Sequence, residues 1–124
     1  MSGSYCLANT WQSSAVSVKP CDSSDRGQHW TVKGNQIFLT DATRRYCLVN
    51  TWNTPEVRTR PCDSRDRGQH WSVKGNQISL TDATRGYCLA NTWGTPDVRS
   101  ERCNSSDRGQ HWTVKGNEIS LTDA

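Results

Sequence analysis

The stretch Asp25-Arg26-Gly27-Gln28-His29-Trp30 decides the fold, because it returns unchanged at residues 66–71 and again at residues 107–112. Sliding the chain against itself by this interval of 41 residues brings it into register without a gap. Over the 37 positions from Tyr5 to Asp41, 23 residues are identical in all three copies. A match this dense is typical of a tandem array. The sequence therefore predicts a single domain, residues 1–124, made of three repeats at residues 1–41, 42–82 and 83–124.

The end of the chain is in phase with its beginning. Leu80-Thr81-Asp82-Ala83 leads towards the next Tyr-Cys pair, and Leu121-Thr122-Asp123-Ala124 stops where the same continuation would follow. We expect a closed ring of three units, because an open solenoid would need atypical polar end caps.

Each repeat is predicted to form four short strands, with no convincing helical stripe. In the first repeat we expect strands over residues 5–9, 16–19, 30–33 and 36–40, with a tight hairpin turn at Gly34-Asn35. Phe38 becomes serine in the other two repeats, so it is expected to face outward. The alternation predicts an inward-facing set that recurs 41 and 82 residues later: Leu7, Val16, Trp30, Val32, Ile37 and Leu39. About twelve short strands predict a closed all-β architecture, which removes exposed sheet edges.

The composition excludes two classes of protein. The 124 residues include 15 Lys and Arg and 12 Asp and Glu, a net charge of +3 that is too slight for an electrostatic nucleic-acid binder. No apolar run approaches the roughly 20 residues needed to cross a bilayer, so we expect no membrane insertion. Apolar residues make up only 32% of the chain, so something besides an ordinary core should help to hold the fold together.

The six cysteines occupy two positions in each repeat: Cys6 and Cys21, Cys47 and Cys62, and Cys88 and Cys103. Threefold equivalence favours one disulfide within each repeat, with buried reduced thiols as the alternative. Their spacing lacks the patterns of zinc sites, and we expect neither a metal nor a cofactor. Disulfides indicate a secreted or extracellular protein. Met1 to Tyr5 lacks the layout of a signal peptide, so either a leader has been removed or export is unconventional.

Four motifs follow one another in a fixed order, here in the second repeat: Tyr46-Cys47-Leu48, Thr54-Pro55-Glu56-Val57, Pro61-Cys62 and Asp66-Arg67-Gly68-Gln69-His70-Trp71. This order resembles the ricin B-chain type of β-trefoil lectin, the Q-x-W family, over nearly the whole chain. The resemblance implies a β-trefoil with pseudo-threefold symmetry, one core tryptophan and one disulfide per repeat. It also implies up to three shallow sites for galactose- or N-acetylgalactosamine-type glycans.

Three site positions depart from the pattern that this resemblance implies. Galactose-binding members carry an Asp two residues after the first Cys, an aromatic two residues before the second Cys, and an Asn before the motif Gln. At these positions in turn, this chain has Ala8, Val49 and Ala90; Lys19, Arg60 and Glu101; and Gly27, Gly68 and Gly109. Either the sugar sites have moved or the fold serves another purpose.

A sugar site needs a flat aromatic ring together with fixed hydrogen-bond donors and acceptors. Two polar runs offer these groups and are identical in all three repeats: Asn9-Thr10-Trp11 and Asp25 to His29, with their equivalents. The candidate carbohydrate-binding residues are Asn9, Trp11, Asp25, Arg26, Gln28 and His29; Asn50, Trp52, Asp66, Arg67, Gln69 and His70; and Asn91, Trp93, Asp107, Arg108, Gln110 and His111.

Each candidate also has a purely structural interpretation. Trp11 could stack under a sugar or plug a packed loop, and Asn9 could contact ligand or cap a turn. The Asp25-Arg26 pair could be a surface ion pair. Gln28 could fix the loop backbone, and His29 could be a solvated side chain on the outer face of its strand.

The sequence thus predicts a lectin and not an enzyme, since three near-copies of one surface offer no asymmetric set of acid, base and nucleophile. The expected partners are oligosaccharides or cell-surface glycoconjugates, bound multivalently by a monomer or homodimer, with agglutination as a consequence. One alternative is a protease inhibitor or other interaction protein that uses one asymmetric loop, Gln12 to Ser14 as against Asn53 to Pro55. The other is an engineered symmetric trefoil without a ligand.

Overall fold

A computed structural model describes residues 4–11 and 13–124. Over these residues the chain forms twelve strands and three one-turn 3-10 helices. The elements are β1 (Tyr5–Asn9), β2 (Val16–Pro20), η1 (Arg26–Gln28), β3 (Trp30–Lys33), β4 (Gln36–Leu39), β5 (Tyr46–Asn50), β6 (Val57–Pro61), η2 (Arg67–Gln69), β7 (Trp71–Lys74), β8 (Gln77–Leu80), β9 (Tyr87–Asn91), β10 (Val98–Arg102), η3 (Arg108–Gln110), β11 (Trp112–Lys115) and β12 (Glu118–Leu121). The predicted strands are confirmed to within one residue. Gln12, in the loop considered for the asymmetric alternative, lies outside the described residues.

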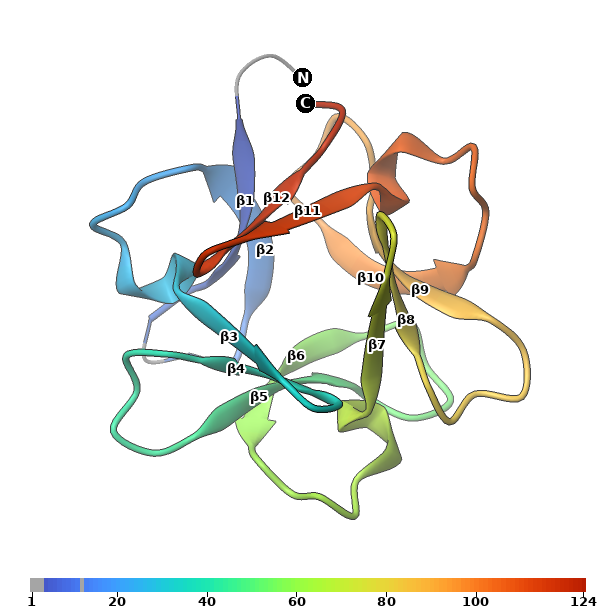
Figure 1. Ribbon diagram of the computed structural model, residues 1–124, viewed down its shortest axis with the longest axis horizontal. Coiled ribbons are helices and arrows are strands. Elements are labelled where there is room, and N and C mark those ends of the chain that lie inside the picture. Colours follow the sequence, from blue (N-terminus) through green and yellow to red (C-terminus); the bar gives the residue numbers. More distant parts are fainter. Residues whose placement is uncertain (1–3, 12) are drawn as a thin grey trace.

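Each sheet combines strands from two neighbouring repeats (Figure 1). The antiparallel orders are β3-β4-β5-β6, β7-β8-β9-β10 and β11-β12-β1-β2. The last order joins the two ends of the chain, because Cys6 on β1 pairs with Ser120 on β12. Phe38 pairs with Cys47 in the same way at the first repeat boundary. The three sheets make a closed β-trefoil, as the phase of the repeats predicts.

Two rings of backbone hydrogen bonds lock the repeats to one another. In the first ring, a core tryptophan N–H donates to the carbonyl of a hairpin-turn asparagine in the neighbouring repeat, at 2.8 Å: Trp30 to Asn117, Trp71 to Asn35, and Trp112 to Asn76. In the second ring, strand N–H groups donate at 3.0 Å to loop carbonyls of the neighbouring repeat: Val18 to Pro96, Thr59 to Ser14, and Ser100 to Pro55. Every repeat is thus both donor and acceptor, so no repeat is free to separate alone.

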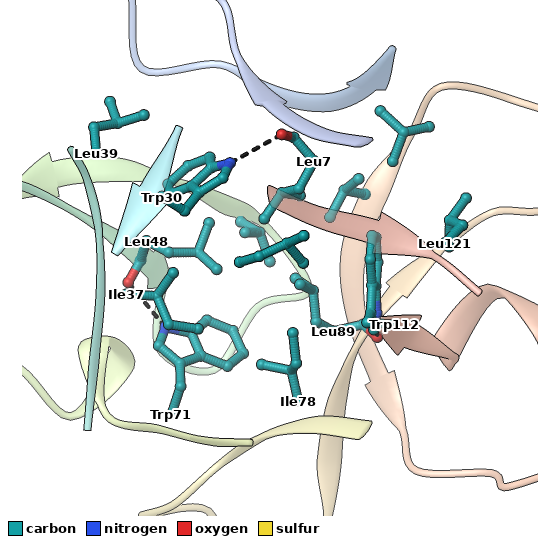
Figure 2. Close-up of a cluster of buried hydrophobic side chains, with 14 of the residues drawn as sticks. Leu7, Trp30, Ile37, Leu39, Leu48, Trp71, Ile78, Leu89, Trp112 and Leu121 are labelled. Atoms are coloured by element: carbon teal, nitrogen blue, oxygen red, sulfur yellow. Dashed lines mark hydrogen bonds between the residues drawn. The ribbon is translucent and has the colours of Figure 1, made fainter. Parts of the chain in front are cut away.

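The core is a ring of three tryptophans packed with leucines and isoleucines (Figure 2). The indole Nε1–H of Trp30 donates to the carbonyl of Leu7 at 2.9 Å, and Trp71 and Trp112 repeat this bond to Leu48 and Leu89. A buried N–H without a partner would be costly, so these bonds make the indole acceptable in the core. Each tryptophan buries about 150–250 Å², which offsets the low apolar content.

Two expectations about side-chain direction are wrong. Val32 was expected inside, but it is 38% exposed, and Val73 and Val114 behave alike. The reason is its position along β3: Val32 lies towards the hairpin-turn end of this edge strand, whereas Trp30 at the other end is 2% exposed and packs in the core. Phe38 was expected outside, but it is buried. The guanidinium of Arg45 lies 4.8 Å from the centre of the Phe38 ring and covers it.

The predicted disulfides are confirmed, one in each repeat. Cys6–Cys21, Cys47–Cys62 and Cys88–Cys103 have Cα–Cα distances of 5.0, 4.9 and 5.0 Å. Each bridge joins the first strand of a repeat to the segment just after its second strand. Three disulfides fit an extracellular or secreted domain. Within the described ranges, the structure has no helix of the length and apolar character that a membrane span requires.

Candidate functional site

Two pockets of similar size lie at the boundaries between repeats. The pocket between the first and second repeats has a volume of about 470 Å³, and the pocket between the second and third has about 450 Å³. Most of their lining residues correspond at an interval of 41. The shared lining of the first pocket is Asn9, Trp11, Ser13, Ser14, Arg26, Leu39, Asp41, Ala42, Thr43, Tyr46 and Thr59. That of the second is Asn50, Trp52, Thr54, Pro55, Arg67, Leu80, Asp82, Ala83, Thr84, Tyr87 and Ser100.

The most distinctive feature of each pocket is an arginine stacked on a half-buried tryptophan. The guanidinium carbon of Arg26 lies 4.6 Å from the centre of the Trp11 ring, and Arg67 and Arg108 lie at the same distance from Trp52 and Trp93. Trp11 also packs against the edge of the hydrophobic core. A sugar can therefore stack on the covered face of the indole only if the guanidinium moves aside.

Asp25 and Gln28 build the loop that carries Arg26. Asp25 caps the one-turn helix η1, with its Oδ1 accepting a hydrogen bond from the backbone N–H of Gly27 at 2.9 Å. Gln28 is 1% exposed; its Oε1 accepts from the N–H of Asp22, and its Nε2 donates to the carbonyl of Pro20. Gln69 and Gln110 have the same burial and equivalent partners. Because their amides are enclosed and already bonded, the structure favours the loop-fixing interpretation of these glutamines over direct sugar contact.

Gly27 explains why the family's usual asparagine is missing before the motif glutamine. A Cβ atom at Gly27 would lie 2.0 Å from the carbonyl oxygen of Asn9, so a side chain does not fit. Ala8, at the position of the family's aspartate, is fully buried, as are Val49 and Ala90. The end of β1 and helix η1 therefore pack directly together at these positions, and the two pockets lie at the repeat boundaries.

Asn9 faces inward and ties the following loop to the next repeat. It is 2% exposed, and its Nδ2 donates to the carbonyls of Ser13 and Ala15 and, at 3.3 Å, to the Thr59 hydroxyl. Asn50 makes the same kind of bonds, ending on Ser100. These asparagines shape the pocket wall, which favours the turn-forming interpretation over a free ligand-binding amide.

His29 is held between two hydrogen-bond acceptors. Its Nδ1 lies 3.1 Å from the Asp41 carboxylate, and its Nε2 lies 2.8 Å from the carbonyl of Ser23. The hydrogen bond with Asp41 raises the pKa of His29, and the Ser23 carbonyl adds to this effect, whereas burial opposes it. His70 and His111 have equivalent contacts and a raised pKa. His29 thus reaches the pocket only through Asp41, which it orients.

Sequence reasoning missed the half of each pocket that follows the core strands. Asp41, Thr43 and Tyr46 line the first pocket and carry groups that bond sugar hydroxyls, a carboxylate and two hydroxyls. The available signal was the Leu-Thr-Asp-Ala run, which recurs at Leu39, Leu80 and Leu121. The candidates were sought in one repeat at a time, but the pocket is assembled from two.

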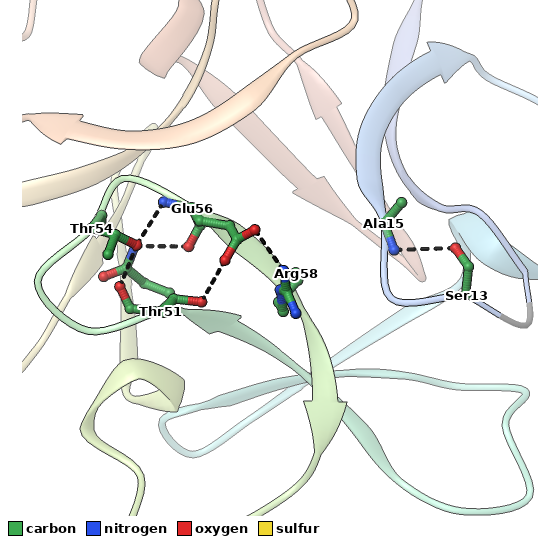
Figure 3. A network of polar contacts seen from close by, with 7 residues as sticks. Ser13, Ala15, Thr51, Thr54, Glu56 and Arg58 are labelled. Atoms are coloured by element: carbon green, nitrogen blue, oxygen red, sulfur yellow. Dashed lines mark hydrogen bonds and ion pairs between the residues drawn. The ribbon is translucent and has the colours of Figure 1, made fainter.

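The loops that differ between repeats keep one turn motif (Figure 3). Ser13 donates its hydroxyl to the carbonyl of Thr10 and accepts from the N–H of Ala15. Thr54 makes the same pair of bonds in the second repeat and Thr95 in the third. The second repeat adds a bond from Thr51 to Glu56 and an ion pair between Glu56 and Arg58. The loop sequences thus differ between the repeats, but the turn and its two hydrogen bonds are the same in all three.

The third boundary differs from the other two at the wall position of residue 18. Val18 stands where the other repeats have Thr59 and Ser100, so Asn91 lacks the hydroxyl partner that Asn9 and Asn50 have. The Oδ1 of Asn91 is buried and has no hydrogen-bond partner among the described residues. The Arg108–Trp93 stack is nevertheless retained there. The three boundaries are therefore similar but not equivalent.

Comparison with known proteins identifies the family. The model of the ricin-type beta-trefoil lectin domain matches residues 2–120. The chain belongs to this family. The resemblance seen in the motifs is confirmed, and the family's domains are carbohydrate-binding, non-catalytic modules.

Two further searches bear on this lectin domain. A search of curated proteins found no match. Among solved structures, the crystal structure of GalNAc-T7 with UDP, GalNAc and Mn²⁺ is similar, with a TM-score of 0.74 and 19% sequence identity. The match covers 91% of this chain and 21% of that chain, so this domain spans about a fifth of the length of its structural neighbour. At this identity the likeness shows the fold alone.

Proposed function

We propose that this domain is a lectin that binds glycans in the pockets at its repeat boundaries. One observation carries the proposal: a half-buried tryptophan, a guanidinium, a carboxylate and hydroxyl groups converge on an open pocket of about 470 Å³, and the same set recurs one boundary further on. A concave site with an aromatic wall and a few fixed polar groups suits a sugar of one or two rings.

The position of these pockets directs the choice of ligand. Ala8 and Gly27 are buried against neighbouring backbone, so the family's standard galactose contacts have no counterpart. Galactose- and N-acetylgalactosamine-type glycans are still the first to test, because the family favours them. We expect their hydroxyl groups to bond to Asp41, Thr43 and Tyr46, with the Trp11 indole as the apolar wall.

Repetition of the pocket favours multivalent binding. Each open and shallow site on its own is expected to bind weakly. Two or three sites on one rigid ring raise the affinity for clustered glycans by about 10²–10⁴-fold where the spacing permits. Agglutination of glycan-bearing cells or particles is the expected consequence.

A glycan array printed at graded density tests the proposal. Binding should rise steeply with glycan density and should fall at least tenfold in a variant with Trp11→Ala, Trp52→Ala and Trp93→Ala combined. A variant that is folded by circular dichroism and binds like the parent would move the site elsewhere on the domain. A folded parent protein that binds no glycan at any density would overturn the lectin function itself.

A further inference from the structure

The three arginines stacked on half-buried tryptophans have no carboxylate partner among the described residues. Within residues 4–11 and 13–124, no carboxylate oxygen lies within 4.0 Å of Arg26, Arg67 or Arg108, and none of these side chains donates a hydrogen bond. Other arginines do pair where an acid is in reach, as Arg58 does with Glu56. With respect to the described residues, the three stacked guanidiniums thus keep their N–H donors available.

Stacking fixes where these donors point. The guanidinium of Arg26 lies 4.6 Å from the centre of the Trp11 ring, and the equivalent pairs at Trp52 and Trp93 repeat this distance. A cation over an indole is attracted by the negative face of the ring, by about 0.5–1 kcal/mol at an exposed site. A flexible exposed side chain is thereby restrained, so that less entropy is lost when its planar fork binds an anion.

Each pocket is lined by one arginine and one aspartate, so its net charge depends on the histidine that is bonded to the aspartate. Asp41 is the acidic residue that lines the first pocket, and His29, which is not a lining residue, lies 3.1 Å from its carboxylate. Asp82 and His70 repeat this arrangement at 3.0 Å in the second pocket. When the histidine is protonated, the acid is neutralised within its own ion pair and the arginine is the uncompensated charge. A planar guanidinium without a partner binds carboxylate or sulfate oxygens with two parallel hydrogen bonds.

We propose that the boundary pockets select acidic glycans, with the guanidinium of Arg26 or Arg67 binding a carboxylate or sulfate group on the sugar. This inference rests on the proposed lectin function and adds the ligand class. The pocket is several times larger than a carboxylate or sulfate ion, and the hydroxyls of Thr43 and Tyr46 are placed to hold the rest of the ring. Charge recognition by arginine here takes the place of ring stacking on the covered face of the indole.

An array of paired glycans tests this selection. Each neutral glycan is printed beside its sialylated or uronic-acid counterpart and beside its sulfated counterpart. We expect about tenfold to hundredfold tighter binding of at least one acidic form than of its neutral parent. A variant with Arg26→Gln, Arg67→Gln and Arg108→Gln should lose this preference, and the corresponding lysine variant should retain only part of it, because lysine lacks the planar fork.

The chain offers a control matched in charge and symmetry. Lys33, Lys74 and Lys115 are exposed, recur in all three repeats and are absent from the lining of both pockets. Replacing all three by glutamine removes the same net charge, and it should leave the preference for acidic glycans unchanged. All variants should remain folded by circular dichroism at the assay temperature, although the arginine variants also lose the stacking on the indoles.

The outcomes separate this inference from the function on which it rests. The proposal is supported if the Arg→Gln variant loses the preference for acidic glycans and the control variant, with Lys33, Lys74 and Lys115 replaced by glutamine, keeps it. The sialylated or uronic-acid glycans and the sulfated glycans then identify the bound group as carboxylate or sulfate. Equal binding of neutral and acidic counterparts overturns it but leaves the lectin function intact. An equal fall in both charge variants also overturns it, because binding would then follow net charge. A folded protein that binds no glycan overturns both proposals.

Discussion

The six tryptophans form two sets of three, one buried in the core and one only half-buried. Trp71 is 2% exposed, and its indole N–H is bonded inside the core to the carbonyl of Leu48. Trp52 is half-buried, lines a pocket and lies beneath the guanidinium of Arg67. Both residues recur in every repeat. Repetition alone therefore does not distinguish a residue that holds the fold from one that faces a ligand, and the environment of the indole does.

Removing the two kinds of indole should have very different effects on stability. Trp71→Ala leaves a large cavity and an unpaired Leu48 carbonyl, so we expect a loss of about 3–5 kcal/mol in the free energy of unfolding. Trp52→Ala removes a side chain that is only partly buried, and the expected loss is about 1–2 kcal/mol. Guanidinium chloride unfolding with the disulfides intact measures both changes. Equal losses in the two variants would mean that Trp52 is a core residue in energetic terms.

Gly68, next to the stacked Arg67, allows helix η2 to pack closely against β5. A Cβ at Gly68 would lie 2.0 Å from the Asn50 carbonyl oxygen, so Gly68→Ala forces helix η2 away from β5 and carries Arg67 with it. We expect a loss of about 1–3 kcal/mol in the free energy of unfolding, together with a change in the fluorescence of Trp52.

Gly86→Ala is the matched control. Its Cβ would meet the Cys103 sulfur at 3.5 Å, which is an ordinary contact, and the equivalent position in the second repeat already carries Arg45. This variant should be as stable as the parent to within about 0.5 kcal/mol. If Gly68→Ala were equally harmless, the close packing of η2 on β5 would not be what excludes a side chain there.

The contribution of the stack itself should be smaller still. Arg67→Gln removes a cation from the face of Trp52, and we expect a loss of about 0.5–1 kcal/mol. Arg65→Gln, at an exposed position of the same loop that is serine in the other repeats, removes the same charge without a stack. A comparison of the two unfolding midpoints isolates the stacking contribution. Equal unfolding midpoints of the two variants would mean that the Arg67 guanidinium does not stack on Trp52 in solution.

The sequence was sufficient for the fold because each of its signals is local or periodic. The strand alternation, the Gly34-Asn35 turn and the 41-residue register each depend on residues close in the chain or on exact repetition. The cysteine pairing followed from symmetry alone. By contrast, Trp30 is buried and Val32 is exposed on the same strand β3, and alternation along one strand does not distinguish them.

The site was less predictable because it is assembled across a boundary. Trp11 and Arg26 were candidates from two separate runs, and their stacking joins residues that are 15 positions apart on separate loops. Tyr46 belongs to the next repeat and enters the pocket only when the sheets close. For Gln28 the sequence left both a ligand contact and a loop-fixing role open, and only the folded loop shows that its amide is enclosed.

The smallest expected effect concerns the histidines that lie behind the pocket acids. The hydrogen bond with Asp41 is the largest cause of the raised pKa of His29, and Asp82 acts in the same way on His70. For His111 the carbonyl of Ser105 is the largest cause, followed by Asp123. Because the pKa is higher in the folded than in the unfolded chain, folding stabilises the protonated ring. This stabilisation is complete below the unfolded pKa of about 6.5 and is lost as the pH rises through the folded value.

We therefore expect the parent to be more stable at about pH 5.5 than at about pH 8.5, relative to a variant in which His29, His70 and His111 are all replaced by glutamine. Glutamine keeps a donor for the carboxylate but does not titrate, so the difference between the two proteins isolates the histidine contribution. Unfolding midpoints measured at both pH values give this difference. The core tryptophans do not titrate, so Trp71→Ala should lower stability equally at the two pH values. If the parent and the triple variant changed in parallel with pH, the charge on the imidazole would contribute nothing to folding, and Asp41 would be held in the pocket wall by geometry alone.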